Sequence, residues 1–179
     1  MFSEKISLGE ISSAYERIKS YISETPLILS NNLTEQTGKD IFLKFEHLQK
    51  TGSFKIRGAT NAILRLNNTQ KNCGVVGVST GNHGRGLAAA AKAAGIRCII
   101  CMSELVPQNK VDNIKALGAE VRIIGKSQDE AQLEVDILVK NEGMTMIPPF
   151  DHPDVINGQG TIALEILKYL PKIDLALIP

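Results

Sequence analysis

Lys55 is the residue of this chain whose surroundings best suit covalent chemistry. It lies in residues 51–59, where Thr51-Gly52 predicts a turn and Ser53 a cap for a helix running to about Leu66. In the first turn of that helix, the positive end of the dipole would disfavour a charged ammonium. A neutral lysine amine is what Schiff-base chemistry requires. A solvated lysine at a helix start is the commoner alternative, and spacing alone does not separate the two.

A second candidate is the loop at residues 79–84, which reads Ser79-Thr80-Gly81-Asn82-His83-Gly84. It follows a predicted strand and enters a predicted helix. Two hydroxyls, an amide and free backbone N–H groups would therefore meet at a helix N-terminus, a position suited to a carboxylate. An ordinary strand-to-helix turn capped by Ser or Asn is the alternative.

Two other motifs compete with these. Residues 84–89 fit the GxGxxA dinucleotide fingerprint, with Glu104 about 20 residues further on. The first glycine of that fingerprint should leave the strand directly, but residues 79–83 intervene, so Gly84 and Gly86 are expected to pack inside a helix. A non-catalytic nucleotide-binding domain stays open as an alternative function.

Cys98 and Cys101 have CxxC spacing within a predicted buried strand. Residues three apart on a strand point to opposite faces, so we expect two core residues and no redox or metal pair. The third cysteine, Cys73, makes an odd count, which argues against a disulfide framework. No metal site is expected.

The elements that must position these residues follow an alternating pattern. Strands are predicted at 74–79, 97–102, 120–124 and 145–147, and helices at 82–94, 107–117 and 127–141. Such alternation predicts an α/β fold with a doubly wound parallel sheet covered on both faces. Ligands bind these sheets at the carboxyl ends of the strands, which is where the 79–84 loop begins.

The flanking segments are predicted less regularly. A helix should begin at a Ser7–Glu10 capping box and end near Glu24, and a short helix should end at Gly38. Residues 40–46 alternate like a strand, 67–72 are predicted to be a polar loop, and a helix should run to about Leu170. Residues 174–179 are predicted to begin another strand.

The charge balance argues against two classes of binding partner. Twenty Lys and Arg residues nearly balance 19 Asp and Glu residues, which leaves no footprint for nucleic acid or an anionic membrane. Residues 1–5 have no signal-peptide pattern and no apolar run is long enough to span a bilayer, so a cytoplasmic protein is expected.

Five blocks in one collinear order resemble the serine/threonine dehydratase family of fold-type II pyridoxal-phosphate enzymes, whose fold is that of the tryptophan synthase β subunit. The resemblance covers nearly the whole chain. The blocks are residues 25–27, 43–46, 53–59, 79–84 and 158–161.

The resemblance implies roles for particular residues. Lys55 would bind pyridoxal 5'-phosphate as a Schiff base and remove the Cα proton, with Phe54 packed beside the cofactor. Asn82 would hydrogen-bond the hydroxyl oxygen of the pyridine ring. The substrate carboxylate would be held by residues of the loop: Ser79, Thr80, Gly81, Asn82 and His83.

The implied reaction is β-elimination, which converts a small hydroxy-amino acid such as L-threonine or L-serine into a 2-oxo acid and ammonia. Racemases of this family resemble Ser-Ser-Gly-Asn at 79–82, and their second serine acts as a base on the opposite face. Thr80 keeps that hydroxyl, so a serine racemase remains an alternative. The Ser-Thr-Gly-Asn-His-Gly-Arg version at 79–85 also resembles hydroxyectoine-utilisation dehydratases.

The resemblance also predicts a domain organisation. Residues 1–69 would begin a large cofactor domain, 70–150 would form a complete small domain, and 151–179 would return to the large one. Relatives continue beyond this point with a glycine-rich phosphate loop, so we expect an incomplete large domain in a truncated chain. Exposed apolar edges would then favour a homo-oligomer, a dimer or higher.

Overall fold

The computed structural model describes residues 6–178 and contains a four-stranded parallel sheet. The strands lie in the order β5 (Glu120–Ile123), β4 (Cys98–Met102), β3 (Val75–Val78) and β6 (Thr145–Met146). Val75 is in register with both Cys98 of β4 and Thr145 of β6. The predicted α/β fold with a parallel sheet is confirmed.

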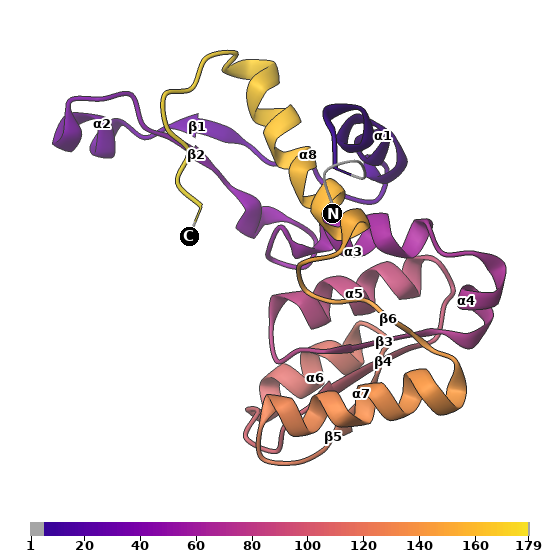
Figure 1. Ribbon diagram of the computed structural model, residues 1–179. Coiled ribbons are helices and arrows are strands. Elements are labelled where there is room, and N and C mark those ends of the chain that lie inside the picture. The colour runs from indigo at the N-terminus through magenta and orange to yellow at the C-terminus, as the bar shows by residue number, and fades with distance from the viewer. Residues whose placement is uncertain (1–5, 179) are drawn as a thin grey trace.

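Helices cover both faces of this sheet, as Figure 1 shows. On one face lie α5 (Asn82–Ala93) and α6 (Gln108–Ala116), and on the other lies α7 (Gln128–Glu142). Ile100 packs in the core on the α5 side and Ile99 in the core on the α7 side. The strand alternation therefore divides the apolar residues between two cores.

Cys98 and Cys101 confirm this alternation. Cys98 packs in the core on the α5 side, whereas Cys101 packs in the core on the α7 side, and both are free. Burial raises the pKa of Cys98 to about 12 and that of Cys101 to about 11. Both thiols therefore stay protonated at neutral pH and serve packing.

Three further helices stack on the outer side of α5. Of these, α3 (Lys55–Leu64) packs against both α5 and α8 (Pro153–Tyr169), and α1 (Leu8–Ile18) packs against α8. A two-stranded antiparallel ribbon of β1 (Leu27–Leu29) and β2 (Phe42–Lys44) projects away from this stack, with α2 (Asn31–Thr37) at its tip (Figure 1). A single 3-10 turn, η1 (Glu46–Leu48), leads from β2 back to the body.

Some predicted boundaries were wrong. The predicted polar loop at 67–72 contains the helix α4 (Asn68–Cys73), because Asn67 and Gln70 form a reciprocal capping box. The first helix ends at Ile18 rather than near Glu24. Turns hydrogen-bonded to the carbonyl of Ile18 follow it, and the side chain of Gln49 then binds both the N–H and the C=O of Ser23.

The carboxyl-terminal segment also differs from its prediction. Residues 174–178 form no strand and expose Leu175, Leu177 and Ile178, while Pro179 lies outside the described residues. No helix within residues 6–178 is both long and apolar enough to cross a membrane. The same residues contain no cluster of His, Cys, Asp or Glu able to hold a metal ion.

Candidate active site

The turn before α3 determines where this helix begins, and therefore where Lys55 lies. Gly52 has φ +74° and its N–H donates to the carbonyl of Gln49 at 2.7 Å, a conformation that glycine adopts without strain. Lys55 is the first residue of α3 and so lies in its first turn, as predicted. The predicted cap was wrong: Phe54 is the N-cap, without a side-chain hydrogen bond, and the Ser53 hydroxyl is buried with no partner among the described residues.

The amine of Lys55 is half-buried and donates one hydrogen bond, at 2.8 Å, to the carbonyl of Pro149. The Phe54 ring lies beside it, with its centroid 5.2 Å from Nζ. None of the described carboxylates forms an ion pair with this amine. Burial lowers the pKa of Lys55, so its neutral form is more accessible than that of a surface lysine. The sequence argument expected this direction from the helix dipole, and the structure supplies burial as the cause.

The loop that follows β3 presents the N-terminus of α5. Ser79 Oγ accepts hydrogen bonds from the N–H of Gly81 at 3.2 Å and the N–H of Gly84 at 2.9 Å. The backbone N–H groups of Asn82 and His83, which lie between these two, have no hydrogen-bond acceptor among the described residues. Because the first N–H groups of a helix have no intrahelical acceptor, these two amides can serve an anion.

His83 is neutral in this arrangement. Its side chain is buried, and Nε2 donates to the carbonyl of Ile147 at 2.8 Å. Burial, reinforced by the positive charge of Lys55, lowers the pKa of His83. Nδ1 is buried without a hydrogen-bond partner among the described residues. Lys55 and His83 thus reach carbonyls only two residues apart, on the segment that follows β6.

The segment of Lys55 also packs against α5, the helix that follows the 79–84 loop. A Cβ on Gly86 would lie 3.0 Å from the backbone nitrogen of Ile56 and 3.1 Å from the carbonyl carbon of Lys55. This close approach brings the first turn of α3 onto α5. Gly84 and Gly86 therefore lie inside α5 and serve packing, as expected, rather than the strand-to-helix turn of a dinucleotide site.

The other loop residues face a different space. Thr80, Gly81 and Asn82 line a pocket of about 280 Å³ together with Arg85 and residues of α6. The exposed Asn82 accepts a 3.1 Å hydrogen bond at Oδ1 from Arg85 Nη2, which leaves its Nδ2 free to donate. Lys55 makes no hydrogen bond to the loop; its link to the predicted loop residues is the electrostatic effect of its charge on His83.

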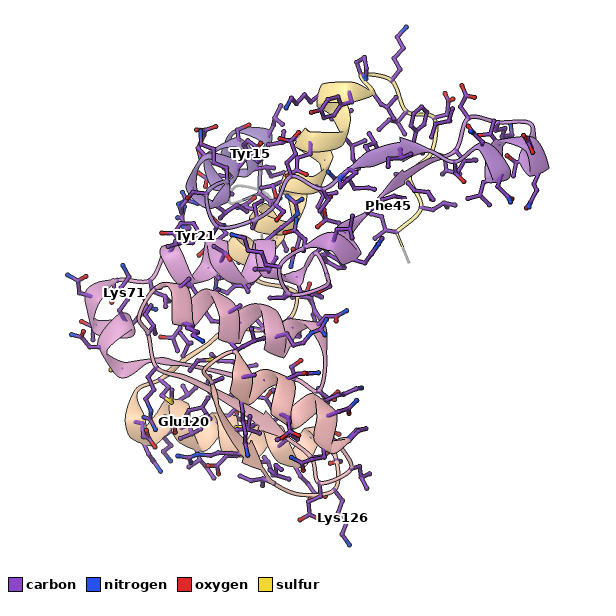
Figure 2. All side chains as sticks on the ribbon, turned by 180° about the vertical axis from the view of Figure 1, so that it is seen from behind. Tyr15, Tyr21, Phe45, Lys71, Glu120 and Lys126 are labelled. Atoms are coloured by element: carbon purple, nitrogen blue, oxygen red, sulfur yellow. The ribbon has the colours of Figure 1, made fainter. Side chains whose placement is uncertain are left out.

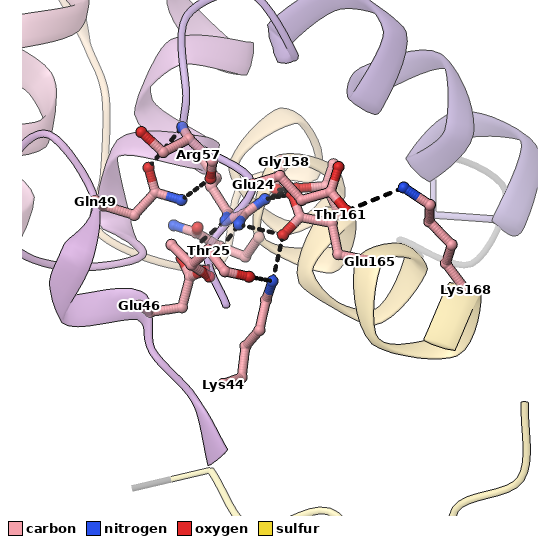
Figure 3. A network of polar contacts seen from close by, with 12 residues as sticks. Glu24, Thr25, Lys44, Glu46, Gln49, Arg57, Gly158, Thr161, Glu165 and Lys168 are labelled. Atoms are coloured by element: carbon pink, nitrogen blue, oxygen red, sulfur yellow. Dashed lines mark hydrogen bonds and ion pairs between the residues drawn. The ribbon is translucent and has the colours of Figure 1, made fainter. Parts of the chain in front are cut away.

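Sequence reasoning missed a buried polar network behind Lys55, shown in Figure 3. Arg57 is fully buried and contacts Glu165 of α8 at 2.6 Å and Glu46 at 2.8 Å. Lys44 also contacts Glu165 at 2.6 Å. Burial alone would raise the pKa of Glu46, but hydrogen bonds from Arg57 and Thr25 outweigh it and lower that pKa. Two carboxylates and two cations thus hold α3, α8 and β2 together.

A crossing of two glycines completes the support of α3. A Cβ on Gly158 of α8 would lie 2.6 Å from both the carbonyl oxygen of Arg57 and the Cα of Gly58. The side chain of Gln159 accepts at 3.2 Å from the N–H of Gly58. The 158–161 block therefore joins α8 to the helix that carries Lys55.

Comparison with known proteins shows the family to which this chain belongs. Residues 18–179 match the family described as "Pyridoxal-phosphate dependent enzyme". The chain belongs to this family. It is 56% identical over 174 residues to a protein of Sinorhizobium fredii named "Putative threonine dehydratase", covering 97% of this chain and 52% of that protein. It is 43% identical over 175 residues to the L-threonine dehydratase catabolic TdcB of Staphylococcus aureus, covering 97% of this chain and 51% of that one.

Solved structures extend the family relationship to the fold. A threonine deaminase from T.th. superposes with a TM-score of 0.86 at 42% identity, covering 93% of this chain and 52% of that one. Serine racemase from Dictyostelium discoideum gives a TM-score of 0.90 at 36% identity, covering 95% and 55%. The fold is thus that of fold-type II family members. The chain spans about half the length of the curated relatives it matches.

Proposed function

We propose that this chain supplies the lysine and the substrate loop of an enzyme that dehydrates a small hydroxy-amino acid, such as L-threonine or L-serine, to a 2-oxo acid and ammonia. The observation that carries the proposal is the Lys55 amine, half-buried beside His83 of the loop and without a carboxylate partner among the described residues. The dehydratase names of the relatives support this choice of reaction.

The residues present fit pyridoxal 5'-phosphate. An aldehyde needs an amine that loses its proton readily, and burial lowers the pKa of Lys55. The pyridine hydroxyl oxygen needs a donor, and Arg85 leaves Nδ2 of Asn82 free. The ring needs an apolar neighbour, and Phe54 lies next to the amine. When bound, the cofactor supplies a sink for the electron pair released at Cα.

Each residue then has a task in the elimination. Lys55 Nζ would hold the cofactor covalently and would accept the proton from the substrate Cα. The amides of Asn82 and His83 bind the substrate carboxylate, together with Ser79, Thr80 and Gly81. Neutral His83 donates to Ile147, so the lowered pKa of Lys55 is due to burial and not to a positive charge on the imidazole. The substrate would lose water across Cα and Cβ, the proton accepted by Lys55 leaving with the Cβ hydroxide, and hydrolysis of the unsaturated amine would give the 2-oxo acid and ammonia.

A spectral titration of the chain with pyridoxal phosphate tests the cofactor assignment. We expect a visible absorption band that borohydride converts into a stable adduct on Lys55, located by mass spectrometry of peptides. Lys55→Ala should lose the band, whereas Lys71→Gln on α4 should keep it. Lys71 is exposed at the outer edge of the molecule in Figure 2, on the helix that follows the end of α3, whereas Lys55 begins α3. An adduct distributed over surface lysines would contradict the assignment.

The reaction is tested with the chain joined to the unmatched half of the Staphylococcus aureus relative. Formation of 2-oxobutanoate from L-threonine is the expected result, abolished by Lys55→Ala. A folded hybrid that binds the cofactor but releases no 2-oxo acid from threonine or serine would refute dehydration while leaving the cofactor assignment intact.

Serine racemisation is the second candidate, supported by the hydroxyl of Thr80 at the pocket and by the likeness to serine racemases. In the same hybrid, a racemase would convert L-serine to D-serine faster than to pyruvate. Thr80→Ala would then abolish D-serine formation, and Thr80→Ser would keep it. Unchanged product ratios in Thr80→Ala would exclude Thr80 as the second base.

We also propose the domain assignment and the assembly predicted from the sequence. The packing of α3 against α8 supports grouping residues 1–69 with 151–179, and the single sheet supports 70–150 as one unit. The exposed apolar side chains of β1 and β2 support self-association of the chain as a homo-oligomer.

A further inference from the structure

The pocket beside the 79–84 loop has a charge that the proposed elimination does not use. Its lining consists of Thr80, Gly81, Asn82, Arg85, Lys110, Asn113 and Ile114. Two of these residues are cations and none is acidic. Lys55, Ser79 and His83 do not line it, so the pocket shares Thr80, Gly81 and Asn82 with the predicted carboxylate-binding loop and extends from there to Arg85 and α6.

Neither cation is neutralised by the rest of the protein. Among the described residues, no carboxylate forms an ion pair with Arg85 or Lys110. Arg85 donates from Nη2 to the neutral amide of Asn82, and its Nε is buried without an acceptor in that part of the chain. Asp112 of α6 accepts from Gln108 and stands two positions from Lys110, a spacing at which helix side chains do not face each other. The positive charge is therefore available to a ligand.

Two helix ends add to this charge. The pocket is bordered by Gly81, the N-cap of α5, and by the first turn of α6, which carries Lys110; neither helix has a side-chain cap hydrogen bond. Free N–H groups at a helix start favour anions. Asn82, Asn113 and Thr80 contribute polar side chains to the same wall. The pocket combines two cations, two helix starts and neutral donors.

We propose that this pocket binds an oxyanion of the carboxylate or phosphate type, and that in the enzyme it takes the side-chain carboxylate of an acidic hydroxy-amino acid such as 3-hydroxyaspartate. The second part rests on the proposed function, which puts the substrate against Thr80 and Asn82. The α-carboxylate would bind the amides of the loop, and the second carboxylate would bind Arg85 and Lys110. Arg85 would contact it through the planar guanidinium that suits carboxylates.

Anion binding is measured on the 179-residue chain without cofactor, so that failure of the cofactor assignment does not affect it. Amide resonances of Gly81, Asn82 and Asn113 are followed by NMR during separate titrations with L-aspartate, L-threonine and inorganic phosphate at constant ionic strength. We expect saturable shifts with L-aspartate. Arg85→Gln and Lys110→Gln should each weaken its binding about tenfold or more, because each removes a charged partner. Lys71→Gln should leave it unchanged.

The three ligands separate the possible results. Tighter binding of L-aspartate than of L-threonine, lost in both pocket variants, supports the acidic substrate. Saturable binding of phosphate but not of L-aspartate, with the same dependence on Arg85 and Lys110, supports the oxyanion site and overturns the substrate. Shifts that do not saturate, or that both variants leave intact, overturn the site. If either glutamine variant does not fold, as judged by circular dichroism, the methionine variant at the same position, Arg85→Met or Lys110→Met, replaces it.

Discussion

At the scale of single residues, Lys55 acts on His83. Each is a base partly or fully withdrawn from water, and the charge of Lys55 contributes to the lowered pKa of His83. Their hydrogen bonds to Pro149 and Ile147 hold both side chains at one short segment. A neutral imidazole next to a readily deprotonated amine is consistent with a nucleophilic lysine.

The lowered pKa of His83 predicts a loss of stability in acid. A base whose pKa is lower in the folded than in the unfolded chain binds fewer protons when folded, so the unfolding free energy falls as pH drops through 6.5 toward the folded value. Urea denaturation at about pH 7.5 and about pH 5.5, on either side of the ordinary histidine pKa, measures this loss. In His83→Gln the decrease should be smaller, because glutamine does not titrate. An equal decrease in both proteins would show that other groups are responsible.

At the same scale, sequence reasoning identified residue types better than contacts. The position of Lys55 in the first turn of a helix followed from the turn at Gly52. The capping box of Asn67 and Gln70 was readable from their spacing and was overlooked. Arg57 and Glu165 are 108 residues apart, and nothing in a single sequence indicates that they pair. The pairing of Arg85 with Asn82 was overlooked, although residues three apart on a helix are neighbours.

At the scale of elements, the network around Arg57 joins three segments. Replacing Arg57 by Met would leave Glu165 buried with only Lys44 as an ionic partner among the described residues. We expect a loss of about 3–5 kcal/mol in the free energy of unfolding, the usual result of removing one member of a buried ion pair. Chemical denaturation checks the value. The double variant Arg57→Met/Glu165→Met should lose less than the sum of the two single variants, and strict additivity would argue against direct coupling.

The contact of α3 with α8 depends on the absence of side chains. In Gly158→Ala, the new methyl group would lie 2.6 Å from backbone atoms of Arg57 and Gly58, which cannot move away as a flexible side chain can. We expect a destabilisation of about 1–3 kcal/mol, typical of overpacking. Gly9→Ala in α1 is the matched control, since its nearest neighbour is 3.8 Å away. It should stabilise the protein by up to ~1 kcal/mol. Equal effects of the two changes would contradict the close crossing.

At the scale of the whole molecule, the ribbon of β1 and β2 exposes apolar side chains in pairs. Leu29 is opposite Phe42 and Ile28 is opposite Leu43, and each is 37–48% exposed. A two-stranded ribbon has unpaired edges as well as exposed faces, which favours association.

This exposure predicts that the isolated chain self-associates. Sedimentation equilibrium should detect oligomers at micromolar concentrations. Leu29→Lys/Phe42→Lys should weaken association about tenfold or more, because it places two charges on one face of the ribbon. Ile137→Lys on α7 is the control, as Ile137 is 50% exposed but lies on a different element. A monomer at all concentrations, or a stronger effect of Ile137→Lys, would contradict association through the ribbon.

The sheet was the most predictable part of the molecule and the ribbon the least. Strands and helices of residues 74–147 alternate with strong periodicity, and each was located to within a few residues. The strand predicted at 40–46 shortened to Phe42–Lys44 because its partner β1 has only three residues, and that pairing was not readable from either segment alone.

The glycine crossing has a consequence for the direction of a single side chain. Gly58 lies three residues after Lys55, and Arg57 lies two residues after it. These contacts determine the rotation of α3 about its own axis. Each residue advances an α-helix by about 100° of rotation. One residue inserted between Lys55 and Arg57 would therefore leave the crossing and the ion pairs in place while turning the amine about 100° away from the carbonyl of Pro149. The direction in which the Lys55 side chain leaves α3 is thus determined by the number of residues between Lys55 and Gly58.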